Sequence, residues 1–232
     1  MIDSITICSG GADSVTLATY LHKIDRSQIL VSFDYGQTHD KEIIFAKELA
    51  KDLGLDHRTV RIPFYAELGI GSAILKSPEG DNVIPYGHYT DDSMKKTVVP
   101  NRNAIFLSIA FALAVEYEAG AVYYGAHAGD HTIYPDCRPS FVAAMATALR
   151  LGTDTNIEIV APFVRMKKAE IIKIGHDLGV DYRKTWTCYE GLQYHCGKCG
   201  ACVERREAFS INGIIDPTIY FDTIEKEGEQ NE

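Results

Sequence analysis

Short apolar runs alternate with helical repeats along most of the chain. The first run, Ile5 to Cys8, leads into a glycine turn and then into a helical repeat of apolar residues. Later apolar runs are bounded by turn residues, which is typical of buried parallel strands. We expect strands over residues 5–8, 28–34, 57–62, 121–125 and 157–162.

Helical periodicity fills the stretches between these strands. Residues 40–53 place apolar side chains on one face, and Gly54 is a typical residue to end such a helix. Strands that alternate with helices predict an α/β fold with a doubly wound, mainly parallel five-stranded sheet. The further helices are expected from about residue 15, and over 103–118, 140–151 with Ser140 as N-cap, 167–178 and 202–209.

Two stretches depart from this alternation. Residues 64–100 are rich in Gly, Pro, Asp and Ser, and are predicted to form an irregular insertion. Residues 223–232 are predicted to be a disordered acidic tail. We therefore divide the chain into an α/β domain at 1–180 that contains the insertion, a C-terminal segment at 181–222, and the tail.

Composition narrows the class of protein. A chain of 232 residues with 46% hydrophobic content can bury the core of one α/β domain with an appendage. No apolar run approaches a membrane span and the start lacks a signal-like segment, so we expect a cytoplasmic protein with no membrane contact. The net charge of −9 argues against a broad nucleic-acid surface, and no direct nucleic-acid partner is expected.

The first strand-to-helix turn carries the sequence Ser-Gly-Gly-Ala-Asp-Ser. Adjacent glycines let the backbone approach an anion, and the helix that follows aims free N–H groups at it. The turn has neither Gly-Lys-Ser/Thr nor Gly-x-Gly-x-x-Gly, so it is not the usual P-loop or dinucleotide loop. A Gly-Gly turn before a capped helix can also be ordinary chain punctuation.

This six-residue turn resembles the pyrophosphate loop of the N-type ATP pyrophosphatases, which release AMP and pyrophosphate. Asp13 can hold a Mg²⁺ ion between phosphate oxygens. The residues expected at the nucleotide are Cys8, Ser9, Gly10, Gly11, Ala12, Asp13 and Ser14.

Two other stretches are expected near the nucleotide. Phe33 and Tyr35 end the second strand and can flank an adenine, although the same residues suit a simple strand-end turn. Arg102 follows a proline-fixed turn, so its guanidinium can pair with phosphate or carboxylate. A solvated arginine at a helix start is the alternative.

The loop after the fourth strand is dense in groups that titrate or bind. An aspartate here can accept two N–H bonds from the amino-imine edge of a guanine-like ring, and Arg138 can neutralise a substrate carboxylate. The loop residues expected to bind substrate are Tyr134, Asp136 and Arg138, and the same loop holds His127, Asp130 and His131.

Four of the six cysteines cluster near the C-terminus as Cys188, Cys196, Cys199 and Cys202. Paired C-x₂-C spacing predicts convergence on one metal, and four thiolates favour a closed, structural Zn²⁺ site. An iron–sulfur cluster is the main alternative. Of the two isolated cysteines, Cys8 suits a small core residue, and we assign no covalent role to Cys137.

In this order, the phosphate loop, Phe33-Asp-Tyr-Gly-Gln37, the Val99-Pro-Asn-Arg102 turn, the 125–138 loop and the four cysteines resemble the 7-cyano-7-deazaguanine synthase family over residues 3–210. The resemblance implies an adenine nucleotide alpha hydrolase-like fold, one zinc ion on the four cysteines, Mg²⁺-ATP in the loop, and a homodimer. The chain departs from the family at Tyr86, where an acidic residue is common.

The resemblance also implies a reaction with small-molecule substrates. An ATP-dependent carbon–nitrogen ligase of this kind converts 7-carboxy-7-deazaguanine and ammonia to the nitrile through adenylated acid and amide intermediates, and releases AMP and pyrophosphate. His127, His131 and Asp130 are the candidate bases, and the sequence does not choose among them. The alternatives are an RNA thiolase with the same ATP loop, a relative that attaches a deazaguanine to a protein, and an ATP-sensing module.

Overall fold

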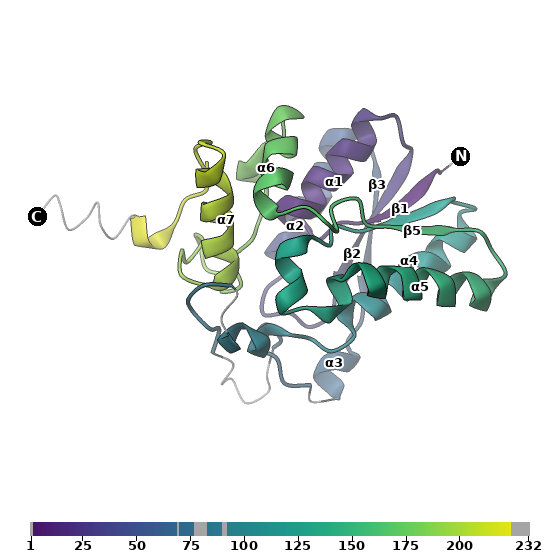
Figure 1. The fold of residues 1–232 in the computed structure, drawn as a ribbon, viewed down its shortest axis with the longest axis horizontal. Coiled ribbons are helices and arrows are strands. Elements are labelled where there is room, and N and C mark those ends of the chain that lie inside the picture. Colours follow the sequence, from purple (N-terminus) through teal and green to yellow (C-terminus); the bar gives the residue numbers. More distant parts are fainter. Residues whose placement is uncertain (1, 69, 77–82, 90–91, 224–232) are drawn as a thin grey trace, which may run out of the picture.

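A computed structural model describes residues 2–68, 70–76, 83–89 and 92–223 (Figure 1). Within these residues, five strands form one parallel sheet in the order β3-β2-β1-β4-β5. The predicted doubly wound α/β fold is therefore confirmed. The strands are β1 (Ser4–Ile7), β2 (Gln28–Asp34), β3 (Asp56–Arg61), β4 (Ala121–Tyr123) and β5 (Glu158–Val160).

Helices cover both faces of the sheet. Figure 1 shows α4 and α5 together on one side, while α1, α2 and α6 lie on the other and α7 lies beyond α6. None of the described helices is long and apolar enough to cross a membrane. The α-helices are α1 (Ala12–Lys23), α2 (Lys41–Leu53), α3 (Phe64–Glu67), α4 (Arg102–Glu116), α5 (Pro139–Thr153), α6 (Lys168–Asp177) and α7 (Gly200–Ile211).

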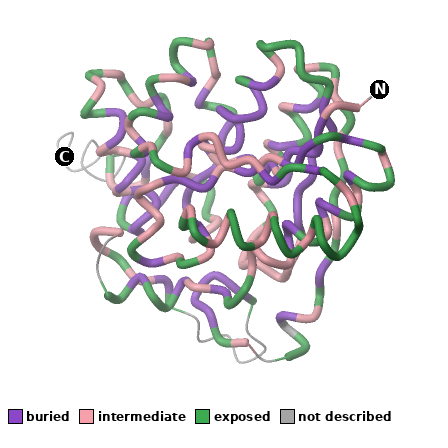
Figure 2. Tube along the Cα trace, turned by 45° about the vertical axis from the view of Figure 1, so that its right-hand side comes forward, coloured by how far each residue is buried: buried purple, intermediate pink, exposed green. Residues whose placement is uncertain are grey.

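The centre of the sheet positions the candidate site. β1 lies between β2 and β4, with Ile5 in register with Ile29 and Val122, and all three side chains are buried. Figure 2 shows buried residues running through the sheet and along the inner sides of the helices. The connections after β1 and β4 leave to opposite faces, and in open α/β sheets ligands bind at such a point, beyond the carboxyl ends of the strands.

Several predicted boundaries were wrong. Ser140 is not the N-cap of α5: the helix begins at Pro139 with Arg138 as N-cap, because proline favours the first helical position. The fourth and fifth strands are shorter than predicted, and α7 begins at Gly200 rather than Cys202. The described part of the 64–100 insertion contains α3 and a 3₁₀ turn at Asp92–Thr97. Residues 224–232 of the predicted tail lie outside the described residues.

Candidate nucleotide site and metal centre

The phosphate loop between β1 and α1 is shaped by its own serines. Gly11 N donates to Ser9 Oγ at 3.2 Å, and Gly10 N donates to Ser14 Oγ at 3.2 Å. Gly10 has φ +95°, and a Cβ at this position would lie 1.9 Å from the backbone oxygen of Glu42. Only glycine fits here, because α2 packs directly against the loop.

A cavity of about 260 Å³ opens beside this loop, beyond the carboxyl ends of β1, β2 and β4. Its size and position are typical of a small-molecule site at a topological switch point. Gly10 does not line this cavity. The predicted residues that do are Cys8, Ser9, Gly11, Ala12, Asp13, Ser14, Phe33, Tyr35, Arg102, His127 and Asp130.

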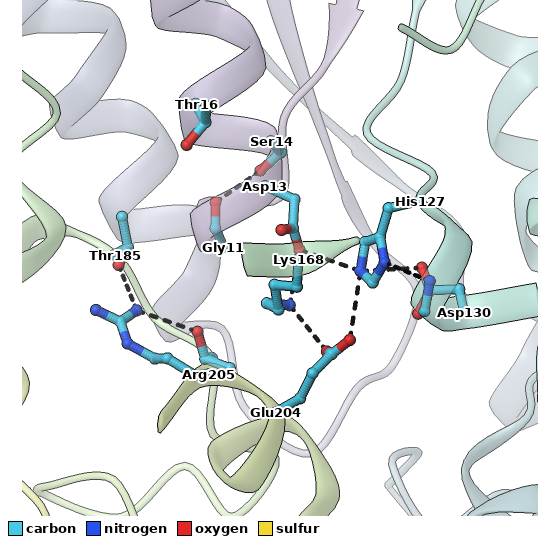
Figure 3. A network of polar contacts seen from close by, with 12 residues as sticks. Gly11, Asp13, Ser14, Thr16, His127, Asp130, Lys168, Thr185, Glu204 and Arg205 are labelled. Atoms are coloured by element: carbon cyan, nitrogen blue, oxygen red, sulfur yellow. Dashed lines mark hydrogen bonds and ion pairs between the residues drawn. The ribbon is translucent and has the colours of Figure 1, made fainter. Parts of the chain in front are cut away.

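A buried lysine supplies the cation that the loop itself lacks (Figure 3). Lys168 Nζ, at the start of α6, lies 2.9 Å from Asp13 Oδ2 and 3.1 Å from Glu204 Oε2. Burial alone would lower the pKa of Lys168, but the two carboxylates raise it, so the amine stays charged. The other oxygen of Asp13, Oδ1, is buried and has no hydrogen-bond partner among the described residues. Such a carboxylate oxygen fits a Mg²⁺ ligand.

His127 lies among the acidic side chains on this side of the cavity. Its Nδ1 accepts a hydrogen bond from Gly129 N at 3.1 Å, so Nε2 carries the proton of the neutral ring. Nε2 lies 3.5 Å from Asp130 and 3.7 Å from Asp13 (Figure 3). Burial would lower the pKa of His127, but Asp130, Asp13 and Glu204 raise it. His127 therefore holds the carboxylates in place.

Other predicted residues lie outside the lining of this cavity. Asp136 Oδ2 accepts a hydrogen bond from Asn103 N at 3.0 Å, at the start of α4. The Tyr134 hydroxyl bonds to Thr97 Oγ1 at 2.6 Å, and Arg138 Nε donates to the backbone oxygen of His131 at 2.9 Å. The structure thus does not place Tyr134, Asp136, Arg138 or His131 in the cavity wall.

The two aromatic residues of β2 differ in position. Phe33 is buried and stacks on Phe106 with ring centroids 4.1 Å apart, so one of its faces is already covered. Tyr35 is half-buried, and the Arg102 guanidinium lies 5.8 Å from its ring centroid. Tyr35 is therefore the more exposed of the two rings, although its ring also contacts Tyr65 and Phe106.

Sequence reasoning missed residues from three distant elements. Lys168, Glu204 and Glu42 line the cavity from α6, α7 and α2. One signal existed for the lysine: a phosphate loop without its own cation needs one from elsewhere. The others had no local signal. Further missed lining residues are Gln37, His39, Asn103, Tyr124, Trp186, Thr187 and Tyr189.

The four clustered cysteines form a candidate metal centre. Their sulfurs all lie within 4.8 Å of one another and are buried, and the Cys196 and Cys202 sulfurs are 4.0 Å apart. A tetrahedral zinc site with Zn–S bonds of about 2.3 Å needs sulfurs about 3.8 Å apart. Cys196 N donates to Cys188 Sγ at 3.2 Å, and Cys199 N donates to Cys196 Sγ at 3.3 Å. As predicted, the set fits one structural metal ion.

The cysteine segment also forms part of the cavity wall. Trp186 N donates to Gly10 O at 3.0 Å, and Trp186 Nε1 donates to Cys188 O at 2.7 Å. Tyr86 pairs with Cys199 in an antiparallel bridge, and its hydroxyl donates to Glu190 at 2.9 Å. Tyr86 thus contacts the metal centre, and the phosphate loop is hydrogen-bonded to the same segment.

The sheet, the glycine loop and the buried cation define an ATP-pyrophosphatase type of nucleotide-binding enzyme. The NMN synthetase from Francisella tularensis shares the fold, with TM-score 0.51 and 14% identity over 97% of this chain and 81% of that one. The model of the queuosine biosynthesis protein QueC family matches residues 3–213, and the chain belongs to that family.

Two curated relatives are named 7-cyano-7-deazaguanine synthase. One from Marinomonas sp. (strain MWYL1) is 48% identical over 217 residues, covering 94% of this chain and 97% of the relative. One from Caldicellulosiruptor saccharolyticus is 48% identical over 217 residues, covering 94% and 95%. The family confirms the predicted resemblance and an enzyme that acts on small molecules.

Proposed function

We propose that the protein converts 7-carboxy-7-deazaguanine, ammonia and ATP to 7-cyano-7-deazaguanine, with release of AMP and pyrophosphate. The observation that carries this proposal is the 48% identity to synthases of that name along 94% of the chain. Ammonia cannot displace hydroxide from a carboxylate at neutral pH, so one ATP adenylates the acid. A second ATP activates the amide oxygen, and loss of AMP leaves the nitrile.

The cavity supports this chemistry through charge and positioning. The Ser9–Ser14 loop and Lys168 would hold the pyrophosphate part of ATP, because they supply N–H groups, hydroxyls and a fixed cation. Asp13 Oδ1 would hold Mg²⁺, which neutralises phosphate charge when bound. Cys188, Cys196, Cys199 and Cys202 would hold Zn²⁺.

Arg102 lines the cavity and is the cation proposed to meet the substrate carboxylate. The roles of His127, His131 and Asp130 as bases, and of Tyr134, Asp136 and Arg138 in substrate contact, stay predictions. Asp136 supports Arg102 indirectly, because it binds the backbone of Asn103 beside it. The ring of the substrate would lie against Tyr35.

We further propose a cytoplasmic homodimer, with the domain division at 1–180 and 181–222. The homodimer is supported by α5, a fifteen-residue helix with no buried residue and with Arg150 as its single charge. Leu151 on this helix is 80% exposed. Apolar helices of this kind favour cover by another subunit. Light scattering should report two copies, and Leu151→Glu should shift the mass to one, unlike Lys173→Glu on α6.

Product mass spectrometry tests the function. Zinc-loaded protein with ATP, ammonium and 7-carboxy-7-deazaguanine should give the nitrile, and AMP release should depend on the acid. Absence of both would overturn the proposal. An RNA thiolase would instead need an iron–sulfur chromophore or thiolated RNA, and a protein-modifying relative would give no free nitrile but a mass increase on a protein.

A further inference from the structure

Glu42 occupies a fixed place beside the phosphate loop. It is the second residue of α2, which starts shortly after the carboxyl end of β2. Its backbone oxygen lies where a Cβ on Gly10 would be, so helix and loop are in direct contact. Its side chain lines the same cavity as Ser9 and Asp13.

The Glu42 carboxylate has no hydrogen bond or ion pair among the described residues. The other acidic groups of the cavity are held: Asp13 and Glu204 by Lys168, and Asp130 by His127. Glu42 is half-buried, and a carboxylate that lines a cavity without a partner is placed to meet a ligand.

Several charged or titratable groups surround Glu42 at longer range. Cys8 faces it from the end of β1 and Tyr35 from the end of β2, while Arg102 and Lys168 act from α4 and α6. Burial raises the pKa of Glu42 to about 7, and the two cations offset only part of that effect. A carboxyl with this pKa accepts and returns protons near neutral pH.

The proposed reaction needs such a group. At neutral pH ammonia is present mainly as ammonium, which has no lone pair to attack carbon. His127 is poorly placed to take the proton, because Nδ1 already accepts from Gly129 and Nε2 points its hydrogen at carboxylates. The Glu42 carboxylate forms no ion pair with a described cationic side chain, so a cation that enters this cavity can pair with it.

We propose that Glu42 binds the ammonium ion and accepts one of its protons, so that neutral ammonia attacks the adenylated carboxyl carbon. This inference rests on the proposed function. The new C–N bond forms as the C–O bond to AMP breaks and AMP leaves with the electron pair. One ammonium proton ends on Glu42 and a second passes to water, which leaves the amide. The nucleophile thus approaches beside the loop that holds the leaving phosphate.

Steady-state kinetics with Glu42→Gln tests this role, and Glu48→Gln on the exposed side of the same helix is the matched control. At about pH 7 we expect kcat/KM for ammonium to fall about 10²-fold, the size of a lost general base. ATP–pyrophosphate exchange driven by the acid alone should stay within about twofold, because adenylation needs no ammonia.

Two further measurements separate proton transfer from packing. The deficit of Glu42→Gln should narrow to less than about tenfold near pH 9, where more of the ammonia is neutral. Hydroxylamine is uncharged at neutral pH, so both proteins should form the hydroxamate at similar rates. Glu42→Asp should recover part of the ammonium-dependent rate.

Other outcomes would contradict the role of Glu42. Unchanged ammonium dependence in Glu42→Gln overturns it, as does a parallel loss of exchange with a raised KM for the acid, which would place Glu42 on the substrate ring. If wild-type protein makes no nitrile, the proposed function itself is overturned, and the role of Glu42 with it. An active wild type beside an unaffected Glu42→Gln overturns the role alone.

Discussion

The cysteine segment and the nucleotide cavity are both buried polar clusters, but they are completed differently. Each cysteine sulfur faces three others, and backbone N–H groups donate to several of them, so the group is closed around one metal position. In the cavity, Asp13 keeps an unpartnered oxygen and Glu42 an unpaired carboxylate. A set of metal-ligand atoms with no open position stabilises a fold, whereas polar groups without partners are available to bind a ligand.

Removal of the metal should have the largest effect. Structural zinc contributes about 10–16 kcal/mol of binding free energy that is coupled to folding. Cys199→Ala should therefore lose zinc and lower Tm sharply, and activity should fall with it because Trp186 joins this segment to Gly10. Metal analysis and thermal unfolding check this, with exposed Ser210→Ala as control. Full activity in a zinc-free protein would show that the metal is not needed to hold the cavity wall in place.

Loss of the buried Lys168 charge should have the second-largest effect. Lys168→Met would leave Asp13 and Glu204 without their ion partner, and breaking a buried pair costs about 3–5 kcal/mol. ATP affinity should also fall. Urea unfolding and ATP titration measure both effects. Lys173→Met removes an exposed pair with Asp177 on the same helix, and solvent screens that pair, so the variant should be nearly silent.

Gly10→Ala tests the contact between the phosphate loop and α2. The added methyl would overlap the Glu42 backbone oxygen and the backbone would be left-handed, so we expect a loss of about 3 kcal/mol or more. Gly54→Ala is the matched control: its φ is +66°, but nothing lies within 4 Å of the added Cβ. It should cost only about 1–2 kcal/mol, from the left-handed backbone alone. Equal losses in urea unfolding would show that contact with α2 is unimportant.

Removal of the Glu42 charge should give a gain in stability that depends on pH. The folded-state pKa of Glu42 is raised to about 7, above its unfolded value of about 4.3, so folding binds a proton in this window. The carboxylate therefore destabilises the fold increasingly as pH rises through this range. Glu42→Gln should raise Tm, with a gain that grows from about pH 5 to about pH 7 and then levels off. A gain independent of pH would exclude this origin.

The features that the sequence predicted well each lie within one short, continuous stretch of the chain. The residue spacing within the Ser9–Ser14 loop and among the four cysteines indicates what each of them binds. The alternation of apolar runs with helical repeats predicts the sheet. Lys168, Glu204 and Glu42 enter the cavity only because α6 and α2 pack against α1, which follows the phosphate loop, and α7 packs against α6. In the 126–138 loop, polar density predicted substrate contacts; Asp136 and Arg138 bind backbone groups and do not line the cavity, and their substrate roles stay predictions.

The N-terminal phosphate loop shares its cavity with residues from the C-terminal part of the chain, and this has a consequence for synthesis of the protein. The cavity starts with Ser9 but is lined by Lys168, Trp186 and Glu204. Domains form as the chain emerges from the ribosome, N-terminal part first. The sheet strands are complete once Val160 has emerged, yet the cavity lacks Lys168 until α6 follows and lacks the Glu204 side of its wall until α7 follows. A prematurely terminated chain would carry the phosphate loop without the pocket that makes it useful.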